Sequence, residues 1–286
     1  GGEVLRHRGC RARGGQVSEK EVPRLSQSTA NILLNQSPAH AYAHHKLLGN
    51  VAKKSTKALD LGTLIDALLL GPGKKKFRVL DFDNFTTKAA KAAKADAIAA
   101  DEIPVLREKY EEAEEVCIIL RDKMYEKGIS LSGGYRHHEV AWANPATGVL
   151  CRGELDYLDI PDILDIKTAA SAKPDAFARS VQSYGYDVQA AAYIEAVESV
   201  RPDLIGRVTM RFVVCETEPP YAVTPITLDG QFRAMGSAKW FAACTRWKEC
   251  LASNSWPDYG SATVSPKPWQ LSEALGLEGV SELVIE

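Results

Sequence analysis

The sequence has no apolar run long enough to cross a bilayer, which would need about 20 consecutive apolar residues. Its most apolar stretch, residues 61–70, is interrupted by Asp66. The first twenty residues contain four arginines but no apolar segment of the kind found in a secretory signal. We therefore expect a protein that does not enter the membrane and that resides in the cytoplasm.

Cysteine is scarce, with six residues in a chain of 286. No Cys-x-x-Cys pair is present, so an iron–sulfur cluster or a zinc site is not expected. The spacing also lacks the tight, even pattern of a disulfide framework, which predicts reduced thiols.

The histidine pairs at 44–45 and 137–138 lack a zinc-motif spacing and are expected at exposed helix or strand ends. A phosphate-binding loop for ATP is missing as well.

Net charge is also small, −2 at pH 7, but the charges are unevenly distributed. Residues 46–94 carry eleven lysines and arginines against four aspartates. Such a block is most often a solvated face, and it is also what binding to a nucleic-acid backbone requires. The candidate phosphate contacts are Lys53, Lys54, Lys57, Lys74, Lys75 and Lys76, with Arg152 further along the chain.

The remaining composition, 45% hydrophobic and 25% charged, is that of a soluble globular protein. Apolar periodicity predicts helices in the first half of the chain, including one long charged helix over 96–127 that is broken or kinked near Pro104. The second half predicts short strands over 137–143, 148–160, 162–167, 205–215 and 222–228, with helices over 174–180, 186–200 and 231–251. This order predicts an α/β fold with a central mixed sheet flanked by helices, against which the N-terminal helices pack.

Two carboxylates and a lysine are the most informative residues. Asp156 lies on one predicted strand and Asp165 on the next, and a tight turn joins the two strands. Lys167 follows Asp165 by two residues, so the strand period places both on one face. Carboxylates are hard ligands that suit Mg²⁺ or Mn²⁺, and such ions activate water for phosphodiester cleavage. Alone, this pattern would more often be a surface salt-bridge lattice.

The surrounding motifs resemble the PD-(D/E)xK nuclease superfamily. Asp156 followed by Asp165-Ile166-Lys167-Thr168 is similar to the branch that reads G-x-x-D and then D-x-K-T, although Leu155 stands where the name-giving proline would be. Gln189 and Tyr193 match the Q-x-x-x-Y helix of RecB-like nucleases. Glu139 matches a glutamate on the preceding strand. The resemblance implies a restriction-endonuclease-like core.

Residues 37–40 and 61–70 further resemble the N-terminal half of RecE-type exonucleases (exonuclease VIII) of phage recombination. The resemblance implies a Mg²⁺-dependent enzyme, with Mn²⁺ as a substitute, that degrades one strand of linear duplex DNA from its 5′ end. It also implies a ring-shaped homo-oligomer, expected to be a tetramer, and a single-strand annealing protein that uses the 3′ overhang. The host would be a bacterial or phage-infected cell.

The same resemblance implies roles for individual residues. The metal ligands would be Asp66, Asp156, Asp165 and the backbone carbonyl of Ile166. Asp66 stands where the family has a histidine. Lys167 would be catalytic, Gln189 would position the lysine or the water, and Glu139 would assist a second ion.

Two alternatives remain open. A DNA-binding or assembly protein could keep this fold without turnover, and a structure-specific endonuclease could use the same residues. For either function we expect a flexible arm over residues 1–22, a single nuclease domain over 23–260, and a C-terminal tail over 261–286.

Overall fold

The computed structural model describes residues 22–51, 61–71 and 76–275. Nine α-helices are found in this part of the chain: α1 (Gln27–Asn35), α2 (Pro38–His44), α3 (Leu61–Leu70), α4 (Lys88–Ala99), α5 (Arg107–Glu126), α6 (Pro174–Tyr184), α7 (Tyr186–Val200), α8 (Gly230–Ser253) and α9 (Pro268–Leu275). The strands are β1 (Lys76–Leu80), β2 (Glu102–Leu106), β3 (Tyr135–Ala143), β4 (Leu150–Asp159), β5 (Asp162–Ala169), β6 (Thr209–Glu216) and β7 (Val223–Thr227), and a 3₁₀ helix spans Pro202–Leu204.

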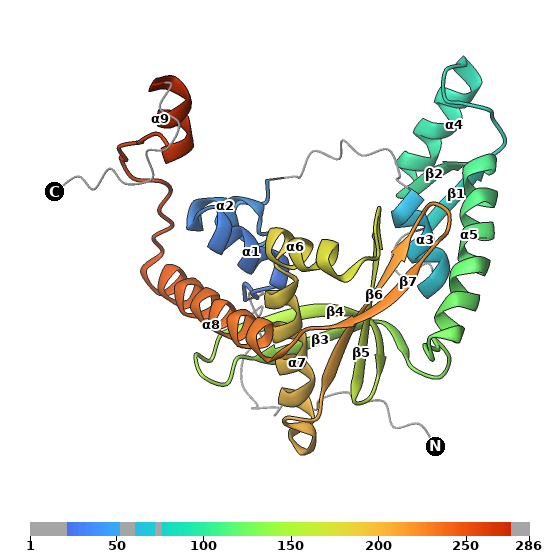
Figure 1. Cartoon of the computed structure of the whole chain (residues 1–286). Coiled ribbons are helices and arrows are strands. Elements are labelled where there is room, and N and C mark those ends of the chain that lie inside the picture. Colours follow the sequence, from blue (N-terminus) through green and yellow to red (C-terminus); the bar gives the residue numbers. More distant parts are fainter. Residues whose placement is uncertain (1–21, 52–60, 72–75, 276–286) are drawn as a thin grey trace, which may run out of the picture.

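The centre of the molecule is a five-stranded mixed sheet in the order β3-β4-β5-β6-β7. Strands β3, β4 and β5 are antiparallel neighbours, whereas β5 and β6 run parallel and are connected through α6 and α7 (Figure 1). Alternating buried and exposed residues in β3 show that one side of this edge strand faces the interior. The predicted α/β fold with a mixed central sheet is therefore confirmed.

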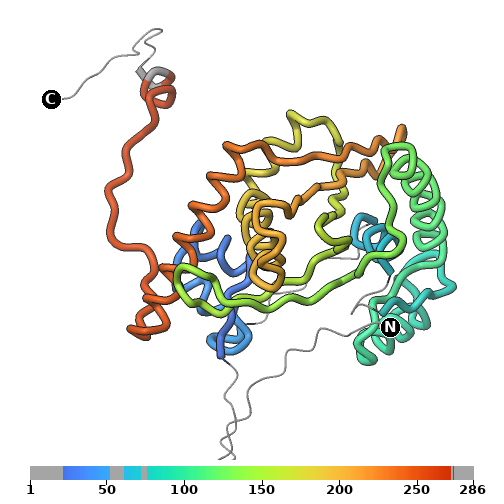
Figure 2. Tube along the Cα trace, turned by 90° about the horizontal axis from the view of Figure 1, so that it is seen from below, coloured from blue at the N-terminus to red at the C-terminus, as the bar shows by residue number. Residues whose placement is uncertain are grey.

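Helices cover both faces of the sheet and enclose two apolar cores. One core lies between the sheet and the helices α1, α7 and α8, and its largest fully buried side chains include Trp240 and Trp247. The other core joins α3 and α5 to β5 and β6 through residues such as Leu64, Leu120 and Ile166. Figure 2 shows the two groups of helices on opposite sides of the strands.

Serine caps begin the first two helices. Ser26 accepts a hydrogen bond from the backbone N–H of Thr29, and Ser37 accepts one from His40, so each hydroxyl satisfies an N–H that the helix leaves unpaired. The second helix ends at His44. His45 then turns inward, is 4% exposed and contacts the carbonyl of Arg24, so the expectation that it is exposed is wrong.

The helix expected over 96–127 is broken at Pro104, as one form of the prediction had it, but a strand occupies the break. That segment holds the end of α4, the strand β2 and the helix α5. Pro104 explains the difference, because proline cannot donate the helical hydrogen bond but is tolerated in the outer strand of a sheet. Strand β2 pairs in parallel with β1, and Arg78 forms an ion pair with Glu102 across the pair.

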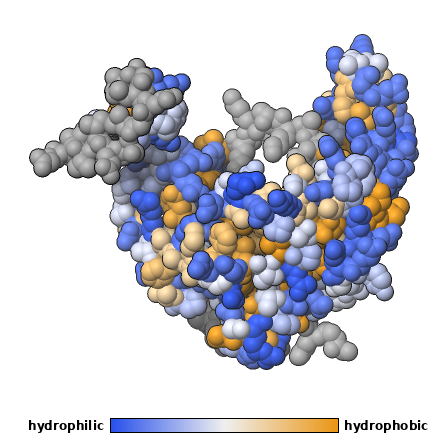
Figure 3. Space-filling view, in the orientation of Figure 1, coloured by the Kyte–Doolittle hydropathy of each residue, from blue (hydrophilic) through white to orange (hydrophobic). Residues whose placement is uncertain are grey.

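The C-terminal segment leaves the body of the protein after α8. Residues 254–267 are extended, and α9 stands apart from the sheet in both views (Figures 1 and 2). The surface is hollowed between this side and the side that carries α4 and α5 (Figure 3). Among the described residues no helix is long and apolar enough to span a membrane.

Candidate active site

The two predicted carboxylates meet where β4 and β5 diverge. Tyr157 pairs with Leu164 in the antiparallel ladder, so continuing the register by one residue places Asp156 opposite Asp165. The ladder is interrupted there, and the backbone N–H of Ile166 donates to Asp156 Oδ2 at 3.0 Å. The hairpin turn between the strands therefore brings together the carboxylates that are nine residues apart in the sequence.

Asp165 lies at the centre of the site and is only 1% exposed. Gln189 Nε2 donates a hydrogen bond to its Oδ1 atom. The ammonium of Lys167 lies 2.5 Å from Oδ2 and forms an ion pair with it. That contact lacks hydrogen-bond geometry, so Oδ2 is a buried oxygen without a hydrogen bond. Buried polar atoms of this kind are uncommon and often mark a functional site.

The charges in this site shift the pKa values of their neighbours. Burial raises the pKa of Asp156 well above the ordinary carboxyl value, and the charges of Asp165 and Asp66 raise it further. Burial would lower the pKa of Lys167, but Asp165 and Asp156 outweigh that effect and raise it, so the ammonium is protonated at neutral pH. One cation thus faces three carboxyl groups, and the site attracts further positive charge.

One face of α7 covers this cluster. Tyr186, Gln189 and Tyr193 are spaced by three and four residues, which places them on the same side of the helix. The ammonium of Lys167 lies 4.8 Å from the centre of the Tyr186 ring, a cation–π contact. Tyr193 packs on Gly153 so closely that a Cβ there would lie 2.8 Å from the ring.

Tyr186 was missed by the sequence reasoning. Its signal was present, because it precedes Gln189 by three residues on a predicted helix. Tyr193 packs against Gly153. Burial raises the pKa of its hydroxyl, and the charge of Asp165 raises this pKa further.

Two predicted residues come from other elements. Asp66 lies on α3, where it is partly buried, and its charge acts on Asp156. Glu139 on β3 pairs with Glu154 on β4 and is exposed. The structure therefore brings Asp66 into electrostatic contact with the cluster, and it places Glu139 on the neighbouring strand, opposite a position two residues before Asp156.

The donor set fits a hard divalent cation. Asp156 and Asp165 offer carboxylate oxygens, one of which is buried without a hydrogen bond, and the pKa of Asp156 shows that an added cation would relieve repulsion. In the described part of the chain no three His, Cys, Asp or Glu side chains already converge as a preformed ligand group. In this structure the Lys167 ammonium forms an ion pair with Asp165 and partly neutralises the charge of the carboxylates.

The candidate phosphate contacts are only partly described. Arg152 is exposed and lines a cavity of about 660 Å³ together with Arg24, Ser26 and Ser28. Glu139, Glu154 and Tyr193 line the same cavity. Lys76 is exposed at the start of β1. The other predicted lysines lie outside the described residues: Lys53, Lys54, Lys57, Lys74 and Lys75.

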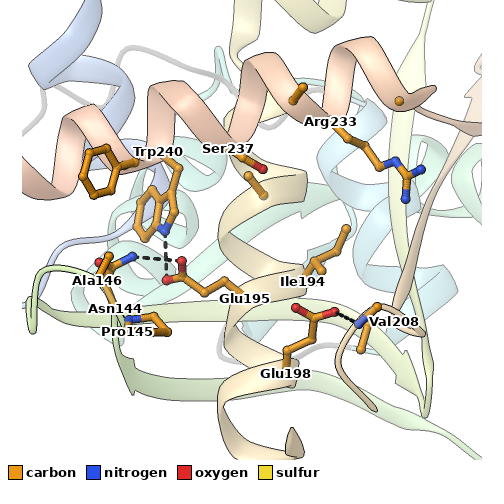
Figure 4. A pocket seen from close by; sticks show the side chains of 15 residues that line it. Asn144, Pro145, Ala146, Ile194, Glu195, Glu198, Val208, Arg233, Ser237 and Trp240 are labelled. Carbon is orange, nitrogen blue, oxygen red and sulfur yellow. Dashed lines mark hydrogen bonds between the residues drawn. The ribbon is translucent and has the colours of Figure 1, made fainter.

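A second cavity, of about 540 Å³, lies between α7, α8 and the turn after β3 (Figure 4). Trp240 and Asn144 donate hydrogen bonds to Glu195 at 3.0 and 2.9 Å, and the N–H of Gly206 donates to Glu198 at 2.7 Å. None of the carboxylates of the β4–β5 cluster lines it. The cavity therefore does not belong to the candidate active site.

Comparisons with known proteins agree with this geometry. The fold and the buried Asp-Asp-Lys cluster define a PD-(D/E)xK-type domain. The chain belongs to the family described as a PDDEXK-like domain of unknown function (DUF3799), whose model matches residues 27–265. The predicted membership of the PD-(D/E)xK superfamily is thereby confirmed. No curated protein matches the chain by sequence.

Solved structures show the same fold. A proposed exonuclease from Eubacterium rectale superposes with a TM-score of 0.56 at 15% identity, covering 93% of this chain and 98% of the other. A phage-related exonuclease from Haemophilus somnus 129PT gives a TM-score of 0.30 at 14% identity, over 67% of this chain and 95% of the other, which is too distant to support an argument. The family identifies a PDDEXK-like domain, and the first of these structures shares its fold.

Proposed function

We propose that the protein is a divalent-metal-dependent exonuclease of the RecE type, which degrades one strand of linear duplex DNA from its 5′ end and leaves a 3′ overhang for recombination. The observation that carries the proposal is Asp165, buried beside Asp156 and contacted by both Lys167 and Gln189. Clustered buried carboxylates repel DNA phosphate, so a protein that only binds DNA gains nothing from them.

The ligands proposed for Mg²⁺, or for Mn²⁺ in its place, are Asp66, Asp156, Asp165 and the carbonyl of Ile166. When bound, such an ion lowers the pKa of a coordinated water and stabilises the leaving oxygen. The ammonium of Lys167 adds a fixed positive charge that can stabilise the negative charge on the phosphate under attack. Gln189 holds Asp165, and Tyr186 confines Lys167, so both act by orienting charged groups. We propose that Glu139 assists a second ion.

DNA contacts are proposed at the arginine-lined cavity. Arg152 and Arg24 line this cavity together with Glu139 and Glu154, and guanidinium forks suit phosphate. The lysines at 53, 54, 57 and 74–76 are proposed to contact the backbone without sequence preference. Replacing Arg152 with alanine should weaken DNA binding and reduce the slope of log affinity against log salt by about one unit. An unchanged slope would show that Arg152 does not contact phosphate.

The reaction is tested with labelled DNA. Linear duplex labelled at the 5′ end, the same duplex labelled at the 3′ end and closed circular DNA are incubated with Mg²⁺ or EDTA. We expect early release of the 5′ label as mononucleotide, late release of the 3′ label, and no loss of circular DNA. Asp165→Asn is the inactive control. Cleavage of the circle would favour the endonuclease, and binding without any cleavage would favour the silent DNA-binding protein.

Assembly is a separate proposal. A homo-oligomeric ring, expected to be a tetramer, would enclose the DNA and hand the 3′ strand to a single-strand annealing protein. Light scattering with and without duplex DNA measures the assembled mass. A monomer under both conditions would contradict the ring without affecting the proposed chemistry.

A further inference from the structure

His137 has an unusual backbone position beside the candidate active site. Arg136 pairs with Tyr157 and His138 pairs with Leu155, so His137 lies opposite Asp156, where the ladder between β3 and β4 is interrupted. Its φ angle is +47°, in the left-handed region that residues other than glycine seldom adopt. This conformation interrupts the regular alternation of the strand at His137.

The imidazole ring joins β3 to the end of α3. His137 Nε2 lies 2.9 Å from the carbonyl oxygen of Gly71, the residue that directly follows α3. Because a carbonyl can only accept, Nε2 is the donor. The other ring nitrogen, Nδ1, lies 3.5 Å from Glu154 Oε1 on β4. The ring therefore connects three segments around the carboxylate cluster.

The end of α3 is held by hydrogen bonds from two directions. The last carbonyls of a helix have no donors within the helix and favour positively polarised partners. Arg121 on α5 donates to the carbonyl of Leu68 at 2.5 Å, and His137 on β3 donates to that of Gly71. Cys117 on α5 also donates to the carbonyl of Ile65 at 3.6 Å, and residues such as Leu64 and Leu69 pack α3 into the apolar core.

Orientation matters for this helix because Asp66 lies on it. Successive residues of an α-helix are 100° apart around its axis, so a small rotation moves Asp66 away from Asp156. Close packing restrains that rotation, and the hydrogen bonds donated by α5 and β3 add directional restraints near the end of the helix. His137 thus provides the hydrogen bond on the side of the sheet that carries Asp156.

We infer that His137 is a positioning residue that fixes α3 so that Asp66 faces Asp156 and completes the cation site. The inference rests on the proposed function, because the carboxylates that hold the cation are the ones proposed there as metal ligands. His137 itself does not contact the cation or the substrate in this role. Its effect on cation affinity therefore requires Asp66.

Two substitutions separate the ring from its backbone. His137→Asn introduces a residue that tolerates the left-handed region. Its shorter amide reaches only the position of Nδ1, so the hydrogen bond to the Gly71 carbonyl is lost. His137→Gln places an amide donor near the position of Nε2 and should restore the contact. His138→Asn is the matched control, because the ring of His138 packs on Tyr135 at 5.3 Å. Thermal unfolding checks that all variants fold.

The measurement is the affinity for Mn²⁺ by calorimetry, without DNA. We expect His137→Asn to bind Mn²⁺ about 10- to 100-fold more weakly, as is usual when a group that orients a ligand is lost. His137→Gln and His138→Asn should remain within about threefold of the unmodified protein by the same reasoning. In a chain that already carries Asp66→Ala, His137→Asn should have no further effect on Mn²⁺ affinity, because the carboxylate that His137 orients is absent.

The result that overturns the inference is unchanged Mn²⁺ affinity in folded His137→Asn, or an additional loss of equal size in the Asp66→Ala background. Failure of the proposed nuclease would appear differently. In that case the unmodified protein would bind Mn²⁺ and show the pattern above, but it would not cleave DNA. Absence of Mn²⁺ binding by the unmodified protein would contradict both.

Discussion

The ion pair between Lys167 and Asp165 couples the stability of the fold to its proposed chemistry. The side chains are 21% and 1% exposed, and the ammonium lies 2.5 Å from the carboxylate. Removing one member of a buried pair leaves an uncompensated charge and costs about 3–5 kcal/mol, whereas removing both is often nearly neutral. The effect should be larger for Lys167, because its loss leaves Asp165 and Asp156 to repel each other.

We therefore expect Lys167→Met to lower the unfolding free energy by about 3–5 kcal/mol in EDTA. For a domain of this size that is a fall in melting temperature of roughly 10 °C. Asp165→Asn should cost less, and the double variant should be more stable than the sum of the two losses predicts. Lys109→Met is the matched control, because the exposed Lys109–Glu112 pair should contribute less than about 1 kcal/mol.

Urea unfolding followed by tryptophan fluorescence measures these differences, and DNA cleavage is measured on the same samples. Mn²⁺ should restore stability to Lys167→Met by replacing the lost cation, but it should help the double variant much less. All three variants should cleave DNA about 10²–10³-fold more slowly or worse. Strict additivity of the stability losses, or a loss no larger than that of Lys109→Met, would refute the reasoning.

Three further outcomes are expected. The pKa of Asp156 is raised on folding, so its ionisation at high pH destabilises the folded state. A bound Mn²⁺ compensates the ionised carboxylate and should therefore raise the melting temperature more at pH 8 than at pH 5. Equal shifts at the two pH values would contradict this prediction. Gly153→Val should lower cleavage and stability by pushing the Tyr193 ring away, and a crystal structure with an unmoved ring would disprove it. In a Cys10→Ser chain the five described thiols should react with a thiol reagent only after unfolding, because all five are buried. Burial also raises the pKa of the Cys215 thiol to about 12, which keeps it protonated. Rapid reaction of these thiols in the folded protein would contradict the prediction.

Local pattern was sufficient where chemistry depends on near neighbours. The strand period places Asp165 and Lys167 together, and a tight turn brings Asp156 opposite them, so the carboxylate cluster could be predicted from the sequence. The resemblance to the Q-x-x-x-Y helix likewise placed Gln189 and Tyr193 on one helix, where the structure has them.

Local pattern failed where a distant segment determined the conformation. The helix expected over 96–127 is divided because Glu102–Leu106 finds a parallel partner in Lys76–Leu80, and no rule of periodicity predicts that partner. His45 was expected to be exposed, but it is buried because the carbonyl of Arg24 satisfies its ring. In both cases a contact between elements outweighed the local preference.

The sequence by itself determined which groups are present and which of them must be close: two carboxylates, a lysine and a helical glutamine on neighbouring elements. Tertiary structure alone decided their states. Burial raised the pKa of Asp156, the Tyr186 ring of α7 confined Lys167, and packing of α3 brought the charge of Asp66 to the cluster. The physical reason is that desolvation and long-range Coulomb interactions depend on what surrounds a group in space, whereas sequence spacing records only its neighbours along the chain.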